Sequence, residues 1–280
     1  MHGPDILADF LTSSDETDKY GNSWQYNSRS DRHSKVGCWG VAFDLLLTSA
    51  LLRDHVSKGM VTIGVNHSMT DFLTHRRKKL DLVFARPSGP ATAASFKGLR
   101  ASYGIGLTAK EISDLNSLPD ASVAPVGAVL IALEAKAAMT AHVKALPRLY
   151  DELNSSHLCV HGASAQAIAI GYVQVNAAGQ FASSVVNNRP LDGDPPQVTS
   201  HTQPKDVLRV IKKIGELPRR TTTGAVGFDG IGMTVLRFEN RGGPVEIVDT
   251  PPAPQRGDAF FYDDMIIRMA NEYDSRFATL

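Results

Sequence analysis

Runs of hydrophobic residues divide the chain into predicted strands and helices. The clearest run is Ala-Val-Leu-Ile-Ala-Leu at 128–133, and a short continuous run of this kind is typical of a buried strand. Similar runs predict further strands at 60–65, 79–86, 166–175, 232–240 and 244–248. The last two flank an Asn-Arg-Gly-Gly segment, which predicts a hairpin. A turn is predicted at 67–71.

Hydrophobic residues at helical spacing alternate with these strands. They predict helices at 5–11, 36–57, 109–115, 206–216 and 260–277. One more helix follows the 128–133 strand, because apolar residues recur at helical spacing from Val143 to Leu153. Thr140 is a candidate N-cap for it, and Pro147 predicts a kink or a late start. Strands and helices together predict an α/β protein with a central mixed sheet flanked by helices.

Three polar or irregular segments separate these elements, and none marks a firm domain boundary, so one domain over 1–280 is predicted. Residues 12–35 form an arm or loop with Trp24, Tyr26 and several basic residues, which either touches nucleic acid or is a solvated loop. Residues 87–126 are rich in Gly, Pro, Ser and Ala and look like an insertion. Residues 187–204 contain four prolines and predict a long loop.

Composition narrows the class of protein without fixing it. Of the 280 residues, 42% are hydrophobic and 21% are charged, as in ordinary globular proteins. Acidic and basic residues balance at 29 each, which counts against DNA binding only mildly, because the local field over a cleft decides. Cys38 and Cys159 are predicted to be reduced thiols. With no signal peptide or membrane span in sight, a cytoplasmic protein is expected.

Charged residues come directly after the 128–133 strand. Glu134 and Lys136 are two apart and would share one face of a strand, and burying such charges is costly unless they are paired or bind an ion. The neighbouring strand at 79–86 contains a single acid, Asp81. Two carboxylates on adjacent strands would make a hard-oxygen site for Mg²⁺, with Mn²⁺ as a substitute. A lysine beside that metal could orient or activate a water for attack on a phosphodiester.

Asp81, then Glu134-Ala135-Lys136, then a helix, resembles the core of the PD-(D/E)xK nuclease superfamily, which includes many restriction endonucleases. The resemblance implies a mixed sheet flanked by helices, a Mg²⁺ cofactor and cleavage of DNA. Leu80 stands where that pattern has proline. The two acids are 134 − 81 = 53 positions apart, which requires an insertion between the strands.

The resemblance also bears on Asp44. In this superfamily a helix before the first core strand often supplies an acid near the metal, and Asp44 matches that place as a predicted outer ligand. A solvent-facing aspartate is the alternative.

Basic residues supply candidates for DNA contact. The densest basic run precedes the Asp81 strand and is predicted to hold phosphates at the rim of a cleft, unless it is an ordinary charged loop. It comprises His75, Arg76, Arg77, Lys78 and Lys79. Lys144 and Arg148, on the helix after Lys136, are further candidates.

The sequence therefore predicts a Mg²⁺-dependent endonuclease of the restriction type that acts on double-stranded DNA. Asp81 and Glu134 would hold the metal, and Lys136 would position the water or help to deprotonate it. Cutting both strands symmetrically favours a homodimer. Two alternatives stay open. One is a non-catalytic module in which Glu134 and Lys136 form a structural ion pair, and the other is a repair or defence nuclease without site specificity.

Other motifs exclude other chemistry. A P-loop, a nucleophile elbow and a complete dinucleotide-binding glycine pattern are all absent from the sequence. His157, Cys159 and His161 alternate as they would on a strand or in a loop, but a fourth ligand is not nearby, so we predict no zinc site there.

Overall fold

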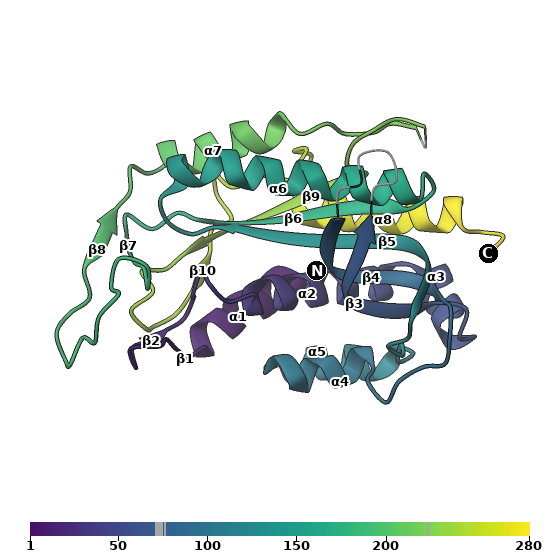
Figure 1. Ribbon diagram of the computed structural model, residues 1–280, viewed down its shortest axis with the longest axis horizontal. Coiled ribbons are helices and arrows are strands. Elements are labelled where there is room, and N and C mark those ends of the chain that lie inside the picture. Colours follow the sequence, from purple (N-terminus) through teal and green to yellow (C-terminus); the bar gives the residue numbers. More distant parts are fainter. Residues whose placement is uncertain (71–74, 76, 223) are drawn as a thin grey trace.

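A six-stranded mixed sheet forms the centre of the computed structural model, which describes residues 1–70, 75, 77–222 and 224–280 (Figure 1). The strand order is β10-β9-β6-β5-β4-β3. β5, β6 and β9 run parallel, and the outer strands are antiparallel to their neighbours. The bounds are β3 Thr62–Thr70, β4 Arg77–Pro87, β5 Val126–Ala138, β6 Ile168–Asn176, β9 Gly230–Arg237 and β10 Glu246–Ile247. The predicted α/β class, the strands and the β9–β10 hairpin are confirmed.

Helices cover both faces of this sheet (Figure 1). They are α1 Gly3–Ser13, α2 Arg32–Thr48, α3 Ala50–Ser57, α4 Phe96–Tyr103, α5 Ala109–Ser117, α6 His142–Ala163, α7 Lys205–Gly215 and α8 Tyr262–Arg276. One hydrophobic cluster joins the sheet to α1, α2 and α8. A second cluster lies on the opposite face, under α6 and α7. Elements from both ends of the chain thus meet on the first face.

Two small sheets lie outside the central one. β1 Glu16–Thr17 pairs with β2 Ser23–Trp24, and β7 Gln180–Ala182 pairs with β8 Val198–Ser200. Trp24 and Tyr26 are buried, so these aromatic side chains of the predicted arm offer no open face to a base.

The predicted 36–57 helix is two helices, because the chain turns by 99° between α2 and α3. Ser49 begins the second one: its buried hydroxyl accepts a hydrogen bond from the amide of Leu52. Serine is a favoured N-cap, and this signal lay hidden inside a continuous hydrophobic pattern. Among helices of the described ranges, no single one is long and hydrophobic enough to cross a membrane. The bent α2–α3 pair has that length and hydrophobicity only when the two helices are taken together.

Three local predictions were wrong. Residues 67–70 continue strand β3 rather than forming a turn. His157, Cys159 and His161 lie in helix α6, not in a strand or loop. That helix has Ala141 rather than Thr140 at its N-cap. Because it begins at His142, before Pro147, the late start is wrong, whereas the alternative of a kink at Pro147 stays a prediction.

The 87–126 insertion contains helices α4 and α5 and belongs to the core. Phe96 of α4 is fully buried and stacks on Trp39 of α2, with ring centroids 4.8 Å apart and planes at 4°. The Trp39 indole also donates a hydrogen bond to the Phe96 carbonyl. This segment therefore extends the hydrophobic layer under α2, since stacked aromatic rings add to the free energy of burial.

The β3–β4 hairpin bends where it reaches Asp81. Leu82 packs in the cluster on the α2 face, whereas Leu80 packs in the cluster on the α6 face. Residues two apart on a regular strand share a face, so the strand must turn between them. Opposite the bend, Asn66 has a φ of 53°, a left-handed conformation that asparagine tolerates better than most residues. Beyond the bend the hairpin runs beside α6 (Figure 1).

Candidate active site

Asp81 lies where strands β4 and β5 separate. The last pair of their ladder is Leu82 with Leu133. Past that point the Asp81 carboxylate takes the place of a backbone acceptor: its Oδ2 accepts a hydrogen bond from the amide of Ala135 at 3.0 Å. The thiol of Cys38, from α2, contacts the same oxygen at 3.8 Å. The carboxylate is thereby fixed beside the Glu134-Ala135-Lys136 segment.

Glu134 is buried with only half of its hydrogen-bonding capacity used. The residue is 2% exposed. Its Oε1 lies 2.7 Å from the Nζ of Lys136 and 3.4 Å from the Nζ of Lys78. Its Oε2 has no hydrogen-bond partner within the part of the chain that the structure describes. An unpartnered buried carboxylate oxygen is costly, which makes this atom a candidate ligand for a cation.

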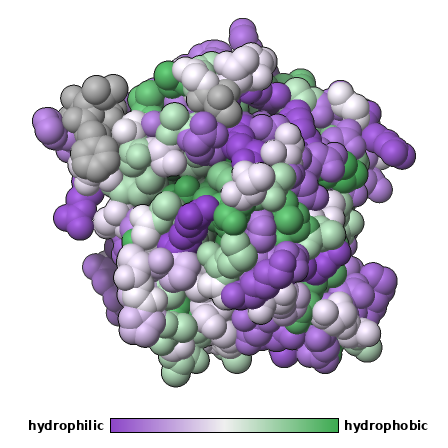
Figure 2. All heavy atoms as spheres, turned by 90° about the vertical axis from the view of Figure 1, so that its right-hand side faces the viewer, coloured by the Kyte–Doolittle hydropathy of each residue, from purple (hydrophilic) through white to green (hydrophobic). Residues whose placement is uncertain are grey.

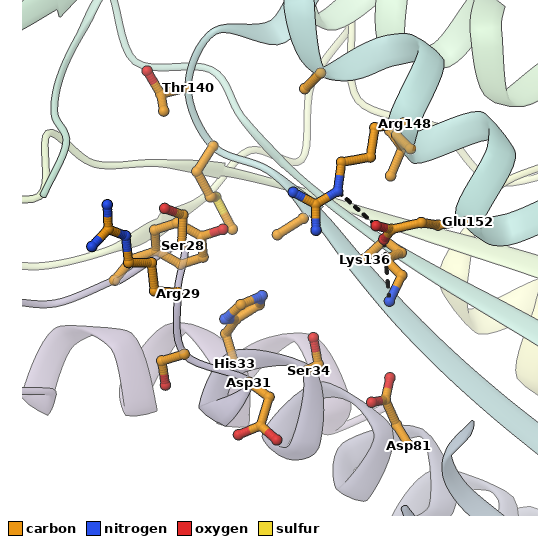
Figure 3. Close-up of a pocket in the computed structure, with 16 residues that line it drawn as sticks. Ser28, Arg29, Asp31, His33, Ser34, Asp81, Lys136, Thr140, Arg148 and Glu152 are labelled. Atoms are coloured by element: carbon orange, nitrogen blue, oxygen red, sulfur yellow. Dashed lines mark hydrogen bonds and ion pairs between the residues drawn. The ribbon is translucent and has the colours of Figure 1, made fainter. Parts of the chain in front are cut away.

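Helix α6 closes the cluster from above the sheet. Lys136 Nζ lies 3.6 Å from Oε2 of Glu152, and Oε1 of Glu152 accepts a hydrogen bond from Nε of Arg148 at 2.6 Å (Figure 3). Figure 3 shows the Asp81 carboxylate pointing toward the lysine from the other side. Lys136 is therefore held between carboxylates from the sheet and from α6.

The charges of this cluster shift each other's protonation. Burial, reinforced by the negative charge of Glu134, raises the pKa of Asp81 to about 6. Burial alone would lower the pKa of Lys136, but the charge and hydrogen bond of Glu134 outweigh it and raise the pKa. Lys136 is consequently an ammonium ion in this arrangement. It can donate hydrogen bonds and neutralise charge, but it cannot accept a proton until Glu134 finds another cation.

A pocket of about 370 Å³ opens onto Asp81 and Lys136 (Figure 3). One wall is the 26–34 segment at the start of α2, and the other is α6. Its labelled polar side chains are Ser28, Arg29, Asp31, His33, Ser34, Asp81, Lys136, Thr140, Arg148 and Glu152. Three of these carry guanidinium or ammonium groups and three carry carboxylates, so the pocket presents both signs of charge.

The donor atoms suit a hard divalent cation. Within the described ranges, no group of three or more His, Cys, Asp or Glu side chains is arranged to hold a metal. Mg²⁺, however, is usually held by one or two carboxylates and completes its shell with waters and substrate phosphates. Asp81 and Glu134 supply two carboxylates, and Oε2 of Glu134 has a free lone pair. The residues present therefore fit Mg²⁺ better than a soft metal.

Asp44 lies apart from this cluster. It is fully buried, so the solvent-facing alternative is wrong. Its Oδ1 accepts from the amide of His2, and its Oδ2 accepts from the amide of Gly3 and the hydroxyl of Tyr262, at 2.8–2.9 Å. The carboxylate thus caps the amino end of α1. Both oxygens are satisfied there, which gives Asp44 a structural task in place of the predicted outer metal ligand.

The basic run divides into separate environments. Arg77 and Lys79 are exposed on β4, and His75 is exposed as well. Lys78 instead turns inward to Glu134, and Arg76 lies outside the described residues. Lys144 and Arg148 are exposed on α6, as DNA contacts would have to be, although Arg148 is already paired with Glu152.

Sequence reasoning missed Glu152 and misjudged Lys78. Glu152 follows Arg148 by four residues on a predicted helix, and that spacing places both on one face and could have indicated the pair. Lys78 could not have been placed, because the bend at Asp81 decides which side of the sheet it meets.

Comparisons with protein-family models, with curated proteins and with solved structures found no match to this chain. The nuclease resemblance therefore rests on the residues and geometry described above.

Proposed function

We propose that the chain is a Mg²⁺-dependent endonuclease with a restriction-endonuclease-like core, hydrolysing phosphodiester bonds in double-stranded DNA. The observation that carries this proposal is the half-satisfied Glu134, buried beside an aspartate whose pKa is raised to about 6. Both features make it unfavourable for Asp81 and Glu134 to be negatively charged together. A divalent cation bound between them would remove that cost. Homodimerisation, which would allow both strands to be cut, belongs to the same proposal.

The residues have distinct tasks in this proposal. Asp81 and Glu134 would hold the metal, which when bound neutralises phosphate charge and lowers the pKa of a water. Lys136 donates hydrogen bonds and orients the attacking water or a phosphate oxygen. Glu152 holds Lys136 in place from α6. Arg29 and Arg148 line the pocket and would contact the backbone phosphates on either side.

One observation favours the non-catalytic alternative. Two ammonium groups, from Lys136 and Lys78, already counter the charge of Glu134, as in a structural ion-pair network. In that case the chain would be an interaction module with a buried network and no need for metal. A nuclease without site specificity is the third possibility, and it differs only in its products.

Metal-dependent nicking of plasmid DNA tests the proposal. The wild-type chain is expected to cleave with Mg²⁺ or Mn²⁺ and to stop when a chelator is added. Lys136→Ala should lower the cleavage rate by about 10²-fold or more, the scale for removing one hydrogen-bond donor to the transition state, with DNA affinity little changed. Discrete bands would indicate a site-specific enzyme and a smear a non-specific one.

Lys58→Ala is the matched control, because Lys58 also pairs with a carboxylate, Asp54, but on the exposed surface of α3. It should cleave like the wild type. Absence of metal-dependent cleavage by the folded wild type would refute the nuclease proposal. Full activity of Lys136→Ala would remove the lysine from the mechanism.

A further inference from the structure

A second pocket, of about 390 Å³, lies between the segment after α7 and helix α8, and it is rich in arginine. Its lining residues are Arg219, Arg220, Thr221, Thr222, Asp229, Arg268, Met269, Glu272 and Arg276. Four guanidinium groups face two carboxylates here, in a chain with zero formal net charge. The pocket shares no lining residue with the Asp81 pocket. It is therefore a separate concentration of positive charge.

Helix α8, which supplies Arg268 and Arg276 to this pocket, runs toward the end of the molecule at which the C-terminus is found (Figure 1). Figure 2 views the molecule from that end. Hydrophilic residues are spread over most of that face, and hydrophobic residues show in smaller patches, several of them near its centre (Figure 2).

Two of the four arginines are buried and bonded to other residues of the chain. The side chains of Arg220 and Arg276 are 1% and 8% exposed, and both donate to Oδ1 of Asp229, at 2.7 and 2.9 Å. Arg276 also bonds to Glu272, and Arg220 donates to the carbonyls of Ala165 and Ala167. These groups form the floor of the pocket, where both oxygens of Asp229 are occupied and Oε1 of Glu272 is taken by Arg276.

The other two arginines lack a carboxylate partner. On helix α8, the acidic residues at ion-pair spacing from Arg268 are Asp264 and Glu272, four residues before and after it. Asp264 instead accepts from the amide of Gly257 at 2.8 Å, and Glu272 pairs with Arg276. Arg219 donates to the carbonyl of Ala259 and lies 4.3 Å from the ring centroid of Phe260. Within the described ranges, neither guanidinium forms an ion pair.

These two unpaired charges also repel each other. Burial lowers the pKa of Arg219, and the nearby positive charge of Arg268 lowers it further. Like charges held together beside a pocket are unfavourable unless an anion joins them. The exposed residues Thr221 and Thr222 add hydroxyl donors at the rim.

We propose that this pocket is a phosphate-binding site in which Arg219 and Arg268 clasp one phosphate group. Guanidinium groups match phosphate oxygens in charge and in the geometry of their paired N–H donors. A pocket with two guanidinium groups that form no ion pair among the described residues best suits a doubly charged terminal phosphate monoester. The site is independent of the proposed nuclease activity, because it involves none of the same residues.

Thermal unfolding of the full chain, titrated with inorganic phosphate at constant ionic strength, tests the site. Binding to the folded state raises the midpoint of unfolding in proportion to RT ln(1 + [L]/Kd). Arg268→Gln should weaken phosphate binding by about tenfold or more, the scale of one lost charge-assisted hydrogen bond. Arg268 is exposed, so this variant should fold normally. Arg256→Gln, another exposed arginine with the same change of charge, should behave like the wild type.

Three outcomes would overturn the proposal. They are the absence of a phosphate response in the wild type, an equal response in Arg268→Gln and Arg256→Gln, and loss of the response in Arg148→Gln instead, which would place the anion in the Asp81 pocket. Asp81→Asn should retain the response even if the nuclease proposal fails.

Two further probes identify the source of the phosphate. An Arg268-dependent response to adenosine 5′-monophosphate supports a free phosphate monoester as the ligand. The second probe is a DNA duplex without terminal phosphates. If Arg268-dependent binding is seen with this duplex and with inorganic phosphate but not with the monophosphate, the site binds the phosphates of a DNA backbone.

Discussion

Asp229 and Asp81 are both carboxylates that lie near cations at the end of a pair of hydrogen-bonded strands. Their surroundings nevertheless shift their pKa values in opposite directions. Asp229 receives two guanidinium groups, the amide of Ala169 and the ring of His161. Burial would raise its pKa, but these bonds outweigh burial and lower the pKa to about 2. Asp81 receives one amide and a weak thiol contact, and its pKa rises to about 6.

This difference separates a structural cluster from a candidate functional one. Around Asp229 both oxygens are occupied and the negative charge is favoured. Around Asp81 and Glu134 the partners are unevenly shared: within the described residues, both ammonium groups pair with Oε1 of Glu134, its buried Oε2 has no hydrogen-bond partner, and Asp81 forms no ion pair. Burial of charge alone does not indicate a functional site. A shortfall of partners at buried charges does, because the fold tolerates a cost that a ligand could remove.

Removing the charge of Asp229 should give the largest change in stability. Asp229→Asn leaves Arg220 and Arg276 buried without their shared carboxylate, and breaking a buried pair from one side costs about 3–5 kcal/mol of unfolding free energy. Urea denaturation at neutral pH measures it. Asp249→Asn, at an exposed site, should change the free energy by no more than about 0.5 kcal/mol. Similar small effects for both variants would break the comparison.

The pH dependence of this loss follows from the sign of the shift. A lowered folded-state pKa contributes stability that is present above the unfolded-state value, near 4, and is lost as the pH falls toward about 2. The gap in stability between the wild type and Asp229→Asn should therefore narrow below about pH 4.

Asp81→Asn should act in the opposite direction and stabilise the chain. The wild-type carboxylate has a raised folded-state pKa, so its ionisation costs stability as the pH rises from about 4 to about 6. Two pKa units correspond to about 3 kcal/mol, an upper bound for the gain above pH 6. The asparagine can still accept the Ala135 hydrogen bond.

Urea denaturation between pH 4 and pH 8 measures this effect, and the advantage of the variant should vanish near pH 4. A destabilised Asp81→Asn at pH 8 would mean that the charged carboxylate is satisfied and would undo the contrast with Asp229. Loss of cleavage together with gained stability would show a carboxylate retained for activity at the expense of the fold.

The sequence was sufficient to place the strands that carry Asp81, Glu134 and Lys136, because short continuous hydrophobic runs are typical of buried strands. It also placed an acid and a lysine at a shared edge. It could not show how these groups are partnered. Lys78 reaches Glu134 only because the hairpin bends at Asp81, and Asp44 caps α1 only because the chain's first residues return to α2. Such contacts depend on long-range packing, which no local pattern encodes.

The smallest expected effect is on the salt dependence of DNA binding, and it concerns the exposed cations near the Asp81 cluster. Arg77 and Lys79 lie on the exposed side of β4, and if they contact DNA phosphates, each lost contact should lower the slope of log affinity against log salt by about 0.9. Binding of duplex DNA to Arg77→Gln/Lys79→Gln across a salt series measures it. Arg237→Gln/Lys213→Gln removes the same charge from surface ion pairs and should leave the slope unchanged. Equal slopes in both double variants would confine the DNA path to α6 and the pocket.

The bend at Asn66 and Asp81 also affects how this protein could evolve. Up to the bend, β3 and β4 are tied into the sheet and share its hydrophobic layers. Beyond it, the hairpin runs along α6, where the described residues Ser68, Arg77 and Lys79 are exposed. This described extension could therefore change in length without disturbing either the core strands or the carboxylates, since insertions are best tolerated at exposed sites. The chain thus separates an adjustable extension from a fixed chemical centre, with one aspartate at the boundary.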